Sequence, residues 1–180
     1  TLKANGATAL VAQRAGVAAA TVVGVGEPTD AAGLITYYYG IDSEKNNLGQ
    51  KLPPLWAKFL PRLGEIANTV PGVCYGVVAP AGPHTEELRY LACIEVSGPG
   101  ALPPGMVAME IPASTYACFT HRGPAQNVDA TVNYIYSSWL LSASQSHSLG
   151  PDLEIYGSQY HPTSADSVMN YAIPITHAGH

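Results

Sequence analysis

Two amphipathic segments, each flanked by short strand-like runs, most constrain the fold of this 180-residue chain. In the first segment, apolar side chains recur at the spacing of one helical face; they are Leu52, Leu55, Trp56, Phe59, Leu60 and Leu63. The second segment shows a similar spacing in Val128, Val132, Ile135, Tyr136, Trp139 and Leu140. Such periodicity predicts two helices that each bury one face. Pro53 and Pro54 suit the first turn of the first helix, and Pro61 is expected to end or kink it.

The runs around these helices are rich in β-branched and aromatic residues and are bounded by glycine and proline, which is typical of strands. The expected strands are residues 20–26, 73–78, 90–96, 106–111, 114–120, 151–157 and 169–175. Residues 1–16 are expected to form an extended arm or an edge strand. Residues 28–48 are expected to form a long connection, which in a compact domain is often functional. Strands interspersed with two helices predict an α+β fold.

The two halves of the chain, at about residues 17–98 and 106–177, look like copies of one strand-helix-strand-strand module. The residues that match in order are Thr21 with Thr115, Trp56 with Trp139, Tyr75 with Tyr156 and Ile94 with Ile173, at spacings of 94, 83, 81 and 79 residues. The drop from 94 to 83 predicts that the first half carries about 11 extra residues. We expect this insertion at about residues 33–47, where it could serve as a lid or a dimer contact.

Charge and composition argue against several classes of function. The net charge of −5 comes from 13 acidic and 8 basic residues, and no cluster of Lys or Arg is present, which argues against nucleic-acid binding. No stretch reaches the roughly 18 consecutive apolar residues of a membrane helix. Cys74, Cys93 and Cys118 lie in apolar runs without CxxC spacing, so reduced cysteines in a cytoplasmic protein are expected. No metal-ligand or nucleotide-binding motif occurs, so neither a metal nor a cofactor is expected.

The strand expected at residues 151–157 carries the strongest candidate for a functional side chain. Because side chains alternate along a strand, Leu153 and Ile155 are expected to face helices, and Glu154 and Tyr156 to face the opposite side. The repeat aligns Glu154 with Val73, so the fold itself does not demand a carboxylate there. Glu154 is therefore either a solvated strand residue or the charged group of a binding or catalytic site.

Several stretches, in this order along the chain, resemble the GyrI-like effector-binding domain, which occurs in AraC- and MerR-type multidrug regulators and as a stand-alone protein. They are residues 55–59, 73–77, 89–96, 111–124, 134–140 and 153–156, of which 111–124 is the most specific. The resemblance implies two strand-helix-strand-strand (SHS2) modules whose antiparallel sheets form a central groove, with the helices outside. It also implies an aromatic-lined groove with an acidic residue that pairs with hydrophobic cations, a role that falls on Glu154. No helix-turn-helix precedes the module, so we expect a stand-alone receptor or enzyme, as a monomer or homodimer.

The ligand-binding residues expected on this basis are Glu154, Tyr156, Tyr75, Trp56, Trp139, Tyr116, Tyr38 and Glu95. Both tryptophans also suit plain core packing. Tyr37, Tyr38 and Tyr39 cannot all be core, because consecutive strand residues alternate.

Three functions stay open at this point. The first is binding of amphipathic, cationic compounds. The second is hydrolysis of electrophilic, cyclopropane-type compounds, with Glu154 as base and Tyr156 or Tyr75 as acid or hydrogen-bond donor. The third is modulation of a protein partner.

Overall fold

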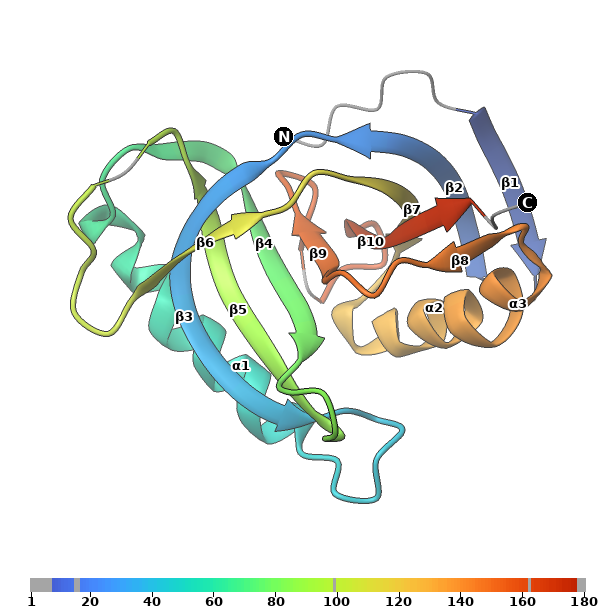
Figure 1. Ribbon diagram of the computed structural model, residues 1–180, viewed down its shortest axis with the longest axis horizontal. Helices are drawn as coiled ribbons and strands as arrows, with labels where there is room; N and C mark the ends of the chain where they lie inside the picture. Colours follow the sequence, from blue (N-terminus) through green and yellow to red (C-terminus); the bar gives the residue numbers. More distant parts are fainter. Residues whose placement is uncertain (1–7, 15–16, 99, 162, 178–180) are drawn as a thin grey trace. The chain divides into compact units, whose positions relative to one another are not determined.

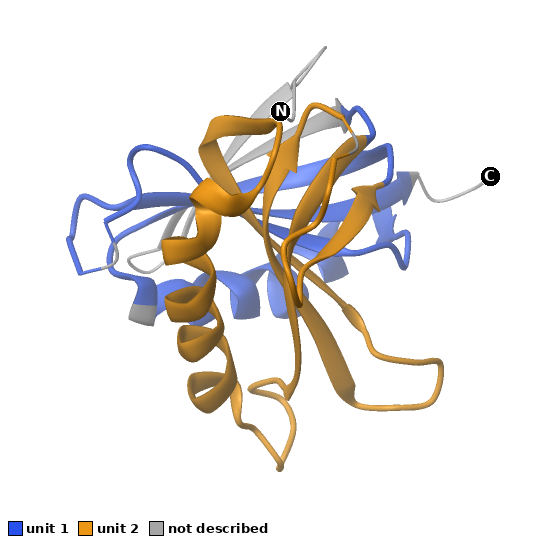
Figure 2. Ribbon diagram, turned by 90° about the vertical axis from the view of Figure 1, so that its left-hand side faces the viewer, with its two compact units in different colours: residues 1–28, 112–180 blue, residues 29–111 orange. Residues whose placement is uncertain are grey.

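The computed structural model describes residues 8–14, 17–98, 100–161 and 163–177. The chain divides into two compact units, which Figure 2 shows in different colours. The terminal unit combines Thr1–Pro28 with Pro112–His180, and the central unit is Thr29–Ile111. Each unit contains an antiparallel sheet and helical segments, which confirms the α+β class.

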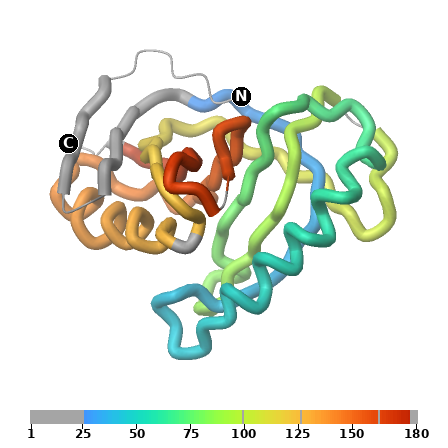
Figure 3. The backbone as a smooth tube through the Cα atoms, turned by 180° about the vertical axis from the view of Figure 1, so that it is seen from behind, coloured from blue at the N-terminus to red at the C-terminus, as the bar shows by residue number. Residues whose placement is uncertain are grey.

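In the central unit, four strands pair antiparallel in the order β4 (Thr69–Pro80), β5 (Glu87–Val96), β3 (Thr29–Tyr39) and β6 (Val107–Ile111). The helix α1 (Leu48–Phe59) lies behind these strands in Figure 1 and in front of them in Figure 3, so it covers one face of the sheet. Its apolar side packs on Tyr90 and Ala92 of β5 through Leu52, Leu55 and Phe59. The predicted apolar helix face is therefore confirmed for Leu52, Leu55 and Phe59. It is wrong for Leu60, which is 49% exposed, because the α-helix ends at Phe59 and the helical spacing changes there.

The start of α1 differs from the prediction. It begins at Leu48, so Pro53 and Pro54 lie inside the helix and not in its first turn. The apolar periodicity begins only at Leu52, so the helix start predicted from it was too late in the sequence. The carbonyl of Asn47 accepts the amides of Gln50 and Lys51 and thus closes a turn before the prolines remove two amide donors. Beyond Phe59 the chain continues as the 3₁₀ helix η1 (Leu60–Glu65), which contains Pro61 and confirms the expected end.

In the terminal unit, β1 (Thr8–Arg14), β2 (Val17–Gly26), β7 (Ser114–Arg122) and β10 (Val168–His177) pair antiparallel in that order. The strands β8 (Gln145–His147) and β9 (Asp152–Tyr156) both pair with β10. Residues 8–14 confirm the predicted edge strand, and the rest of the predicted arm, residues 1–7 and 15–16, lies outside the described residues.

One helical run covers part of the terminal sheet. After the short 3₁₀ turn η2 (Ala125–Asn127) it passes through α2 (Val128–Tyr134), the π-helical turn η3 (Ile135–Trp139) and α3 (Leu140–Ser142). Ile135, Val132 and Trp139 pack on strand residues that include Phe119 and Tyr171. The second predicted helix face is thus confirmed. No helix among the described residues is both long enough and apolar enough to cross a membrane.

The long connection predicted for residues 28–48 is wrong in its first part, because residues 29–39 form β3. Asp30 and Gly33 made this stretch look like a loop, yet Gly33 is needed where the backbones of β3 and β5 approach closely. The turn at residues 40–47 remains as the connection to α1. Strand β2, assigned from the sequence to the first half, pairs instead with β7 of the terminal unit.

The correction to β3 also changes the repeat spacing. Both units contain three strands in one order, β4–β5–β3 in the central unit and β9–β10–β7 in the terminal unit. With β3 as the first strand, its start at Thr29 lies 85 residues before Ser114, the start of β7. This spacing is close to the other three, so the mismatch that indicated an insertion came from matching the wrong strand. Duplication of an ancestral module stays a prediction.

Substitution of Gly33 tests the close approach of β3 to β5. A Cβ atom on Gly33 would lie 1.8 Å from the carbonyl oxygen of Ala92, so the backbone must move to admit one. We expect Gly33→Ala to lower the free energy of unfolding by at least about 2 kcal/mol in urea denaturation. The control is Gly49→Ala at an exposed position of α1, where a Cβ meets nothing within 4 Å. This control should raise stability by about 0.5–1 kcal/mol, and equal effects of the two substitutions would contradict the register.

Candidate functional site

The candidate site lies on β9, where three polar side chains share one face of the strand. Asp152, Glu154 and Tyr156 are each two residues apart and so point the same way. The hydroxyl of Tyr156 donates to Oε1 of Glu154 at 2.8 Å. The ring of Tyr156 packs against that of Tyr160, with the two centroids 4.5 Å apart. The predicted pairing of Glu154 with Tyr156 on one face is therefore present.

The face itself is not the one expected from the sequence. Glu154 lies directly opposite Tyr171 of β10, and opposed residues of an antiparallel pair project to the same side. Tyr171 belongs to the apolar cluster that packs against the helical run of the terminal unit. Glu154 therefore lies on the helix-bearing face, and Leu153, which is 1% exposed, lies on the other. The sequence reading erred because it took the more apolar side of β9 for the side that meets helices.

Asp152 is a buried carboxylate that the sequence analysis did not single out. It accepts hydrogen bonds from the hydroxyl of Tyr136 in η3 and from the hydroxyl of Tyr171 in β10, the latter at 2.9 Å. Its Oδ1 lies 2.8 Å from Nε2 of His147 in β8. Because Asp152 lies two residues before Glu154, the alternation of side chains along a strand predicts that both lie on the same face. Asp152 thus links the helix, β8, β9 and β10.

The protonation of His147 follows from its neighbours. The backbone N–H of Leu149 donates to Nδ1 of His147 at 2.9 Å, so Nδ1 carries no proton. In the neutral ring the proton therefore resides on Nε2, and this N–H donates a hydrogen bond to Oδ1 of Asp152. The ring of Tyr136 stacks on the imidazole with the centroids 6.1 Å apart. This arrangement is that of a structural hydrogen-bond network whose donors are all supplied by the protein.

The tyrosines around the two carboxylates hold their protons firmly. Burial raises the pKa of Tyr171, Tyr136 and Tyr116, and the negative charge of Asp152 raises the pKa of each further. Burial also raises the pKa of Tyr160, with a further contribution from Glu154. Each phenol therefore remains an O–H group at neutral pH. Phenols in this state can donate hydrogen bonds, and their ring faces can attract cations.

The central unit holds a separate group of predicted residues. Tyr75 of β4 is buried, and its pKa is raised to about 12, first by burial and then by the charge of Glu95 on β5. Tyr75 lies opposite Cys93, whose Sγ contacts the Tyr75 carbonyl at 3.5 Å. Burial raises the pKa of Cys93, so this thiol stays protonated. Tyr75, Cys93 and Glu95 share the face of the sheet opposite α1.

The remaining predicted residues are packed as core side chains. Trp56 donates from Nε1 to the hydroxyl of Tyr90 at 3.0 Å, and Tyr38 meets the same Tyr90 ring edge-on. Trp139 packs edge-on against Phe119 with the centroids 5.0 Å apart. Tyr116 is buried and donates to the carbonyl of Pro112 at 3.2 Å. Tyr37 is exposed while Tyr38 is buried, which is the alternation predicted for this tyrosine run.

The structure therefore brings together Glu154 and Tyr156 in the terminal unit and Tyr75 and Glu95 in the central unit. The ligand-binding roles of these residues, and the groove implied by the resemblance, stay predictions.

Comparison with known proteins identifies the kind of domain. Residues 28–176 match the family of GyrI-like small molecule binding domains. The chain is 36% identical over 131 residues to the transcriptional regulator BrlR of Pseudomonas aeruginosa, an alignment that covers 71% of this chain and 47% of BrlR. The chain thus spans about half the length of this curated relative.

Solved structures share the fold. SAV2435 bound to tetraphenylphosphonium aligns with a TM-score of 0.67 at 13% identity, over 86% of this chain and 92% of that one. The C-terminal domain of EcmrR aligns with a TM-score of 0.64 at 16% identity, over 91% of this chain and all 100% of that one. An integron cassette protein of Vibrio cholerae gives a TM-score of 0.63 at 15% identity, over 96% and 100% of the two chains. At such identities the likeness shows the fold alone.

Removal of one donor tests the network around Asp152. We expect Tyr136→Phe to lower the free energy of unfolding by about 1–3 kcal/mol, because a buried carboxylate loses a hydrogen bond while the ring is kept. Tyr134→Phe, two residues away in the same helical run, is the matched control and should be nearly neutral, since no hydrogen bond of the Tyr134 hydroxyl occurs among the described residues. Thermal unfolding of both variants measures the difference. Equal stability of the two variants would show that the Asp152 network contributes nothing.

Proposed function

This chain belongs to the family of GyrI-like small-molecule-binding domains, and we propose that it binds amphipathic cations through Glu154. The observation that carries the proposal is the setting of Glu154 on β9. It is a half-buried carboxylate that accepts the Tyr156 hydroxyl at 2.8 Å and lies close enough to Tyr160 and Tyr171 to raise the pKa of both.

A carboxylate in this setting favours a cation for two physical reasons. Partial burial removes water from the charge, so an arriving positive group is attracted more strongly than at a fully exposed site. The faces of Tyr156 and Tyr160 add cation–π attraction of about 0.5–2 kcal/mol each where a cation lies over the ring. An apolar body attached to the cation gains further by burial against these rings.

The neighbouring carboxylate, Asp152, is less suited to the same role. Three donors of the terminal unit, Tyr136, Tyr171 and His147, already converge on it. A ligand cation there would have to displace a donor from a buried network, which is costly. We therefore assign the ligand charge to Glu154 and the structural role to Asp152.

The related fold of SAV2435, whose structure holds tetraphenylphosphonium, provides a probe for this chain. Titration should be followed by the emission of Trp56 and Trp139, the two tryptophans of the sequence. Tetraphenylborate has the same shape as tetraphenylphosphonium and the opposite charge, so the pair separates charge selection from apolar burial.

We expect the wild-type chain to bind tetraphenylphosphonium more tightly than tetraphenylborate. Glu154→Gln should weaken binding of the cation by at least about tenfold and leave the anion unaffected or better bound. Glu44→Gln, which removes one exposed charge from the turn before α1, is the charge-matched control and should behave as wild type. Loss of affinity for both ions in Glu154→Gln, or for neither, would overturn the assignment of charge selection to Glu154.

A second candidate function, hydrolysis of an electrophilic small molecule, is favoured by the Tyr156–Glu154 hydrogen bond. Glu154 would take a proton from a water molecule while the oxygen of that water attacks a carbon of the strained ring. Tyr156 would donate a proton to the ring carbon that leaves when the C–C bond breaks. Chromatography of an activated cyclopropane incubated with the chain measures this directly. If the chain is an enzyme, product should exceed protein in amount and fall in both Glu154→Gln and Tyr156→Phe. Binding without product formation would contradict the hydrolytic function and leave small-molecule binding as the proposed function.

A further inference from the structure

The central unit contains an open cavity of about 390 Å³ that no predicted site residue lines. It lies where the sheet continues past the C-terminal end of α1, between β3, β6 and the segments around Ile66 and Ala101. Most of its lining is small or apolar, including Ala32, Val96, Leu102 and Ala108. Its volume falls within the range of about 300–1,000 Å³ that is usual for sites of small ligands.

The cavity exists because the sheet extends beyond the end of α1, so that part of its face is not covered by the helix. Ala32 belongs to the apolar cluster under α1, and its cross-strand partner Ala108 lies on the same face but is exposed. The α-helix ends at Phe59, and Ile66 of the following segment packs with that same cluster. The alanine side chains are too small to fill the remaining space.

The walls of the cavity are held in place by hydrogen bonds of the central unit. Nη2 of Arg62, in η1, donates to the carbonyl of Pro104 at 2.8 Å, and Nε of Arg62 is paired with Glu65 at 2.9 Å. On the other side, the backbone amide of Ser97 donates to the carbonyl of Asn68 at 2.8 Å. These hydrogen bonds connect segments that adjoin the lining residues Ala67, Gly98 and Leu102.

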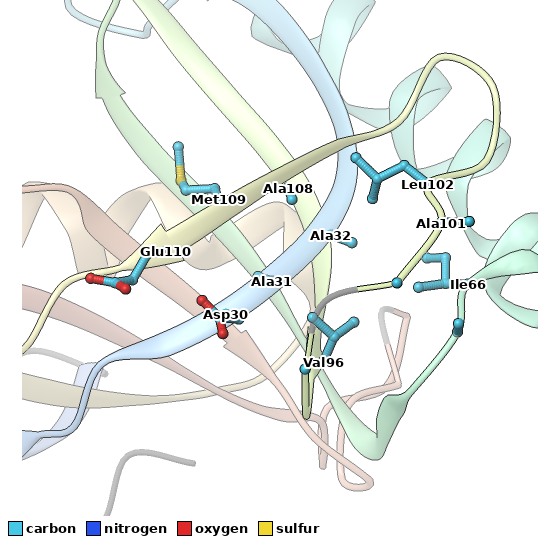
Figure 4. A pocket seen from close by; sticks show the side chains of 13 residues that line it. Asp30, Ala31, Ala32, Ile66, Val96, Ala101, Leu102, Ala108, Met109 and Glu110 are labelled. Carbon is cyan, nitrogen blue, oxygen red and sulfur yellow. The ribbon is translucent and has the colours of Figure 1, made fainter.

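Two carboxylates lie together at one end of this cavity. Asp30 of β3 and Glu110 of β6 are directly opposed in the antiparallel register, and both line the cavity. Figure 4 shows their side chains on neighbouring strands at one end, with Ile66, Ala101 and Leu102 towards the other. No described Lys or Arg forms an ion pair with either carboxylate. Like charges directly opposite one another destabilise a strand pair, so a cation held between them would relieve the repulsion.

We propose that this cavity is a second binding site, for a small amphipathic ammonium compound whose alkyl chain enters the cavity and whose charged head lies between Asp30 and Glu110. An organic cation fits better than a metal ion, because the described residues offer no group of three or more side chains able to ligate one. The site is independent of Glu154, which belongs to the other unit.

The probe is octylammonium, with n-octanol and octanoate as the neutral and anionic compounds of the same chain length. Binding is followed by the backbone amide signals of Leu102 and Ala108 in two-dimensional NMR spectra, with those of Tyr156 and Tyr160 in the terminal unit as internal references. All measurements are made on the Glu154→Gln background, so that failure of this proposal and failure of the function proposed for Glu154 are observed separately.

We expect octylammonium to shift the Leu102 and Ala108 signals saturably and to bind more tightly than n-octanol or octanoate. Asp30→Asn with Glu110→Gln should weaken the binding of octylammonium by about tenfold, which corresponds to two ion pairs at exposed carboxylates. Asp42→Asn with Glu44→Gln removes one aspartate and one glutamate from the exposed turn after β3 and should change nothing. A third variant, Ala108→Leu, places a larger side chain in the cavity and should weaken the binding of octylammonium, n-octanol and octanoate alike.

Three outcomes would overturn the proposal. The first is equal binding of octylammonium and n-octanol, which would exclude a role for the two carboxylates. The second is an equal effect of the Asp30/Glu110 and Asp42/Glu44 double substitutions, which would reduce the site to a general effect of net charge. The third is a set of shifts confined to Tyr156 and Tyr160, which would place octylammonium in the terminal unit.

Discussion

The terminal unit depends on one buried carboxylate, Asp152, at the start of β9. A buried charge without partners costs several kcal/mol, so the donors that meet it are strongly constrained in position. Here the donors come from three elements, namely Tyr136 of the helical run, His147 of β8 and Tyr171 of β10. Because Asp152 is tied to all three, the register of β9 is fixed at its first residue. Glu154, two residues further on, takes its place on the sheet from that register.

The sequence could predict β9 and both helices because their signals are local. Alternation and helical spacing depend on neighbours within a few residues, and both survive in the structure. The face of Glu154 could not be predicted in the same way. It depends on which side of β10 the helical run covers, and β10 is apolar on both sides, with Tyr171, Ala172 and Ile173 all buried. A strand buried on both faces gives no periodicity from which its orientation can be read.

Strand β3 shows a different limit. Its glycine and its acidic residue are both unfavourable in strands, so propensity argues against the element that forms. The reason for Gly33 lies in β5, since only a residue without a Cβ can lie so close to the Ala92 carbonyl. A tertiary contact thus overrides the local signal. By contrast, Asp152 could have been found from sequence alone, because the period that placed Tyr156 beside Glu154 places Asp152 there as well.

The acidic residues of this fold differ in how their charge is balanced, and this difference separates structure from binding. The three side-chain donors around Asp152 belong to the fold, so its charge stabilises the protein and offers little to a ligand. Glu154 accepts the hydroxyl of Tyr156 beside aromatic rings, a setting that favours a desolvated cation. Asp30 and Glu110 oppose each other at the end of an apolar cavity, where the fold gains from any positive charge placed between them. The cation binding that we propose for each unit therefore rests on the surroundings of each carboxylate, and not on the number of carboxylates.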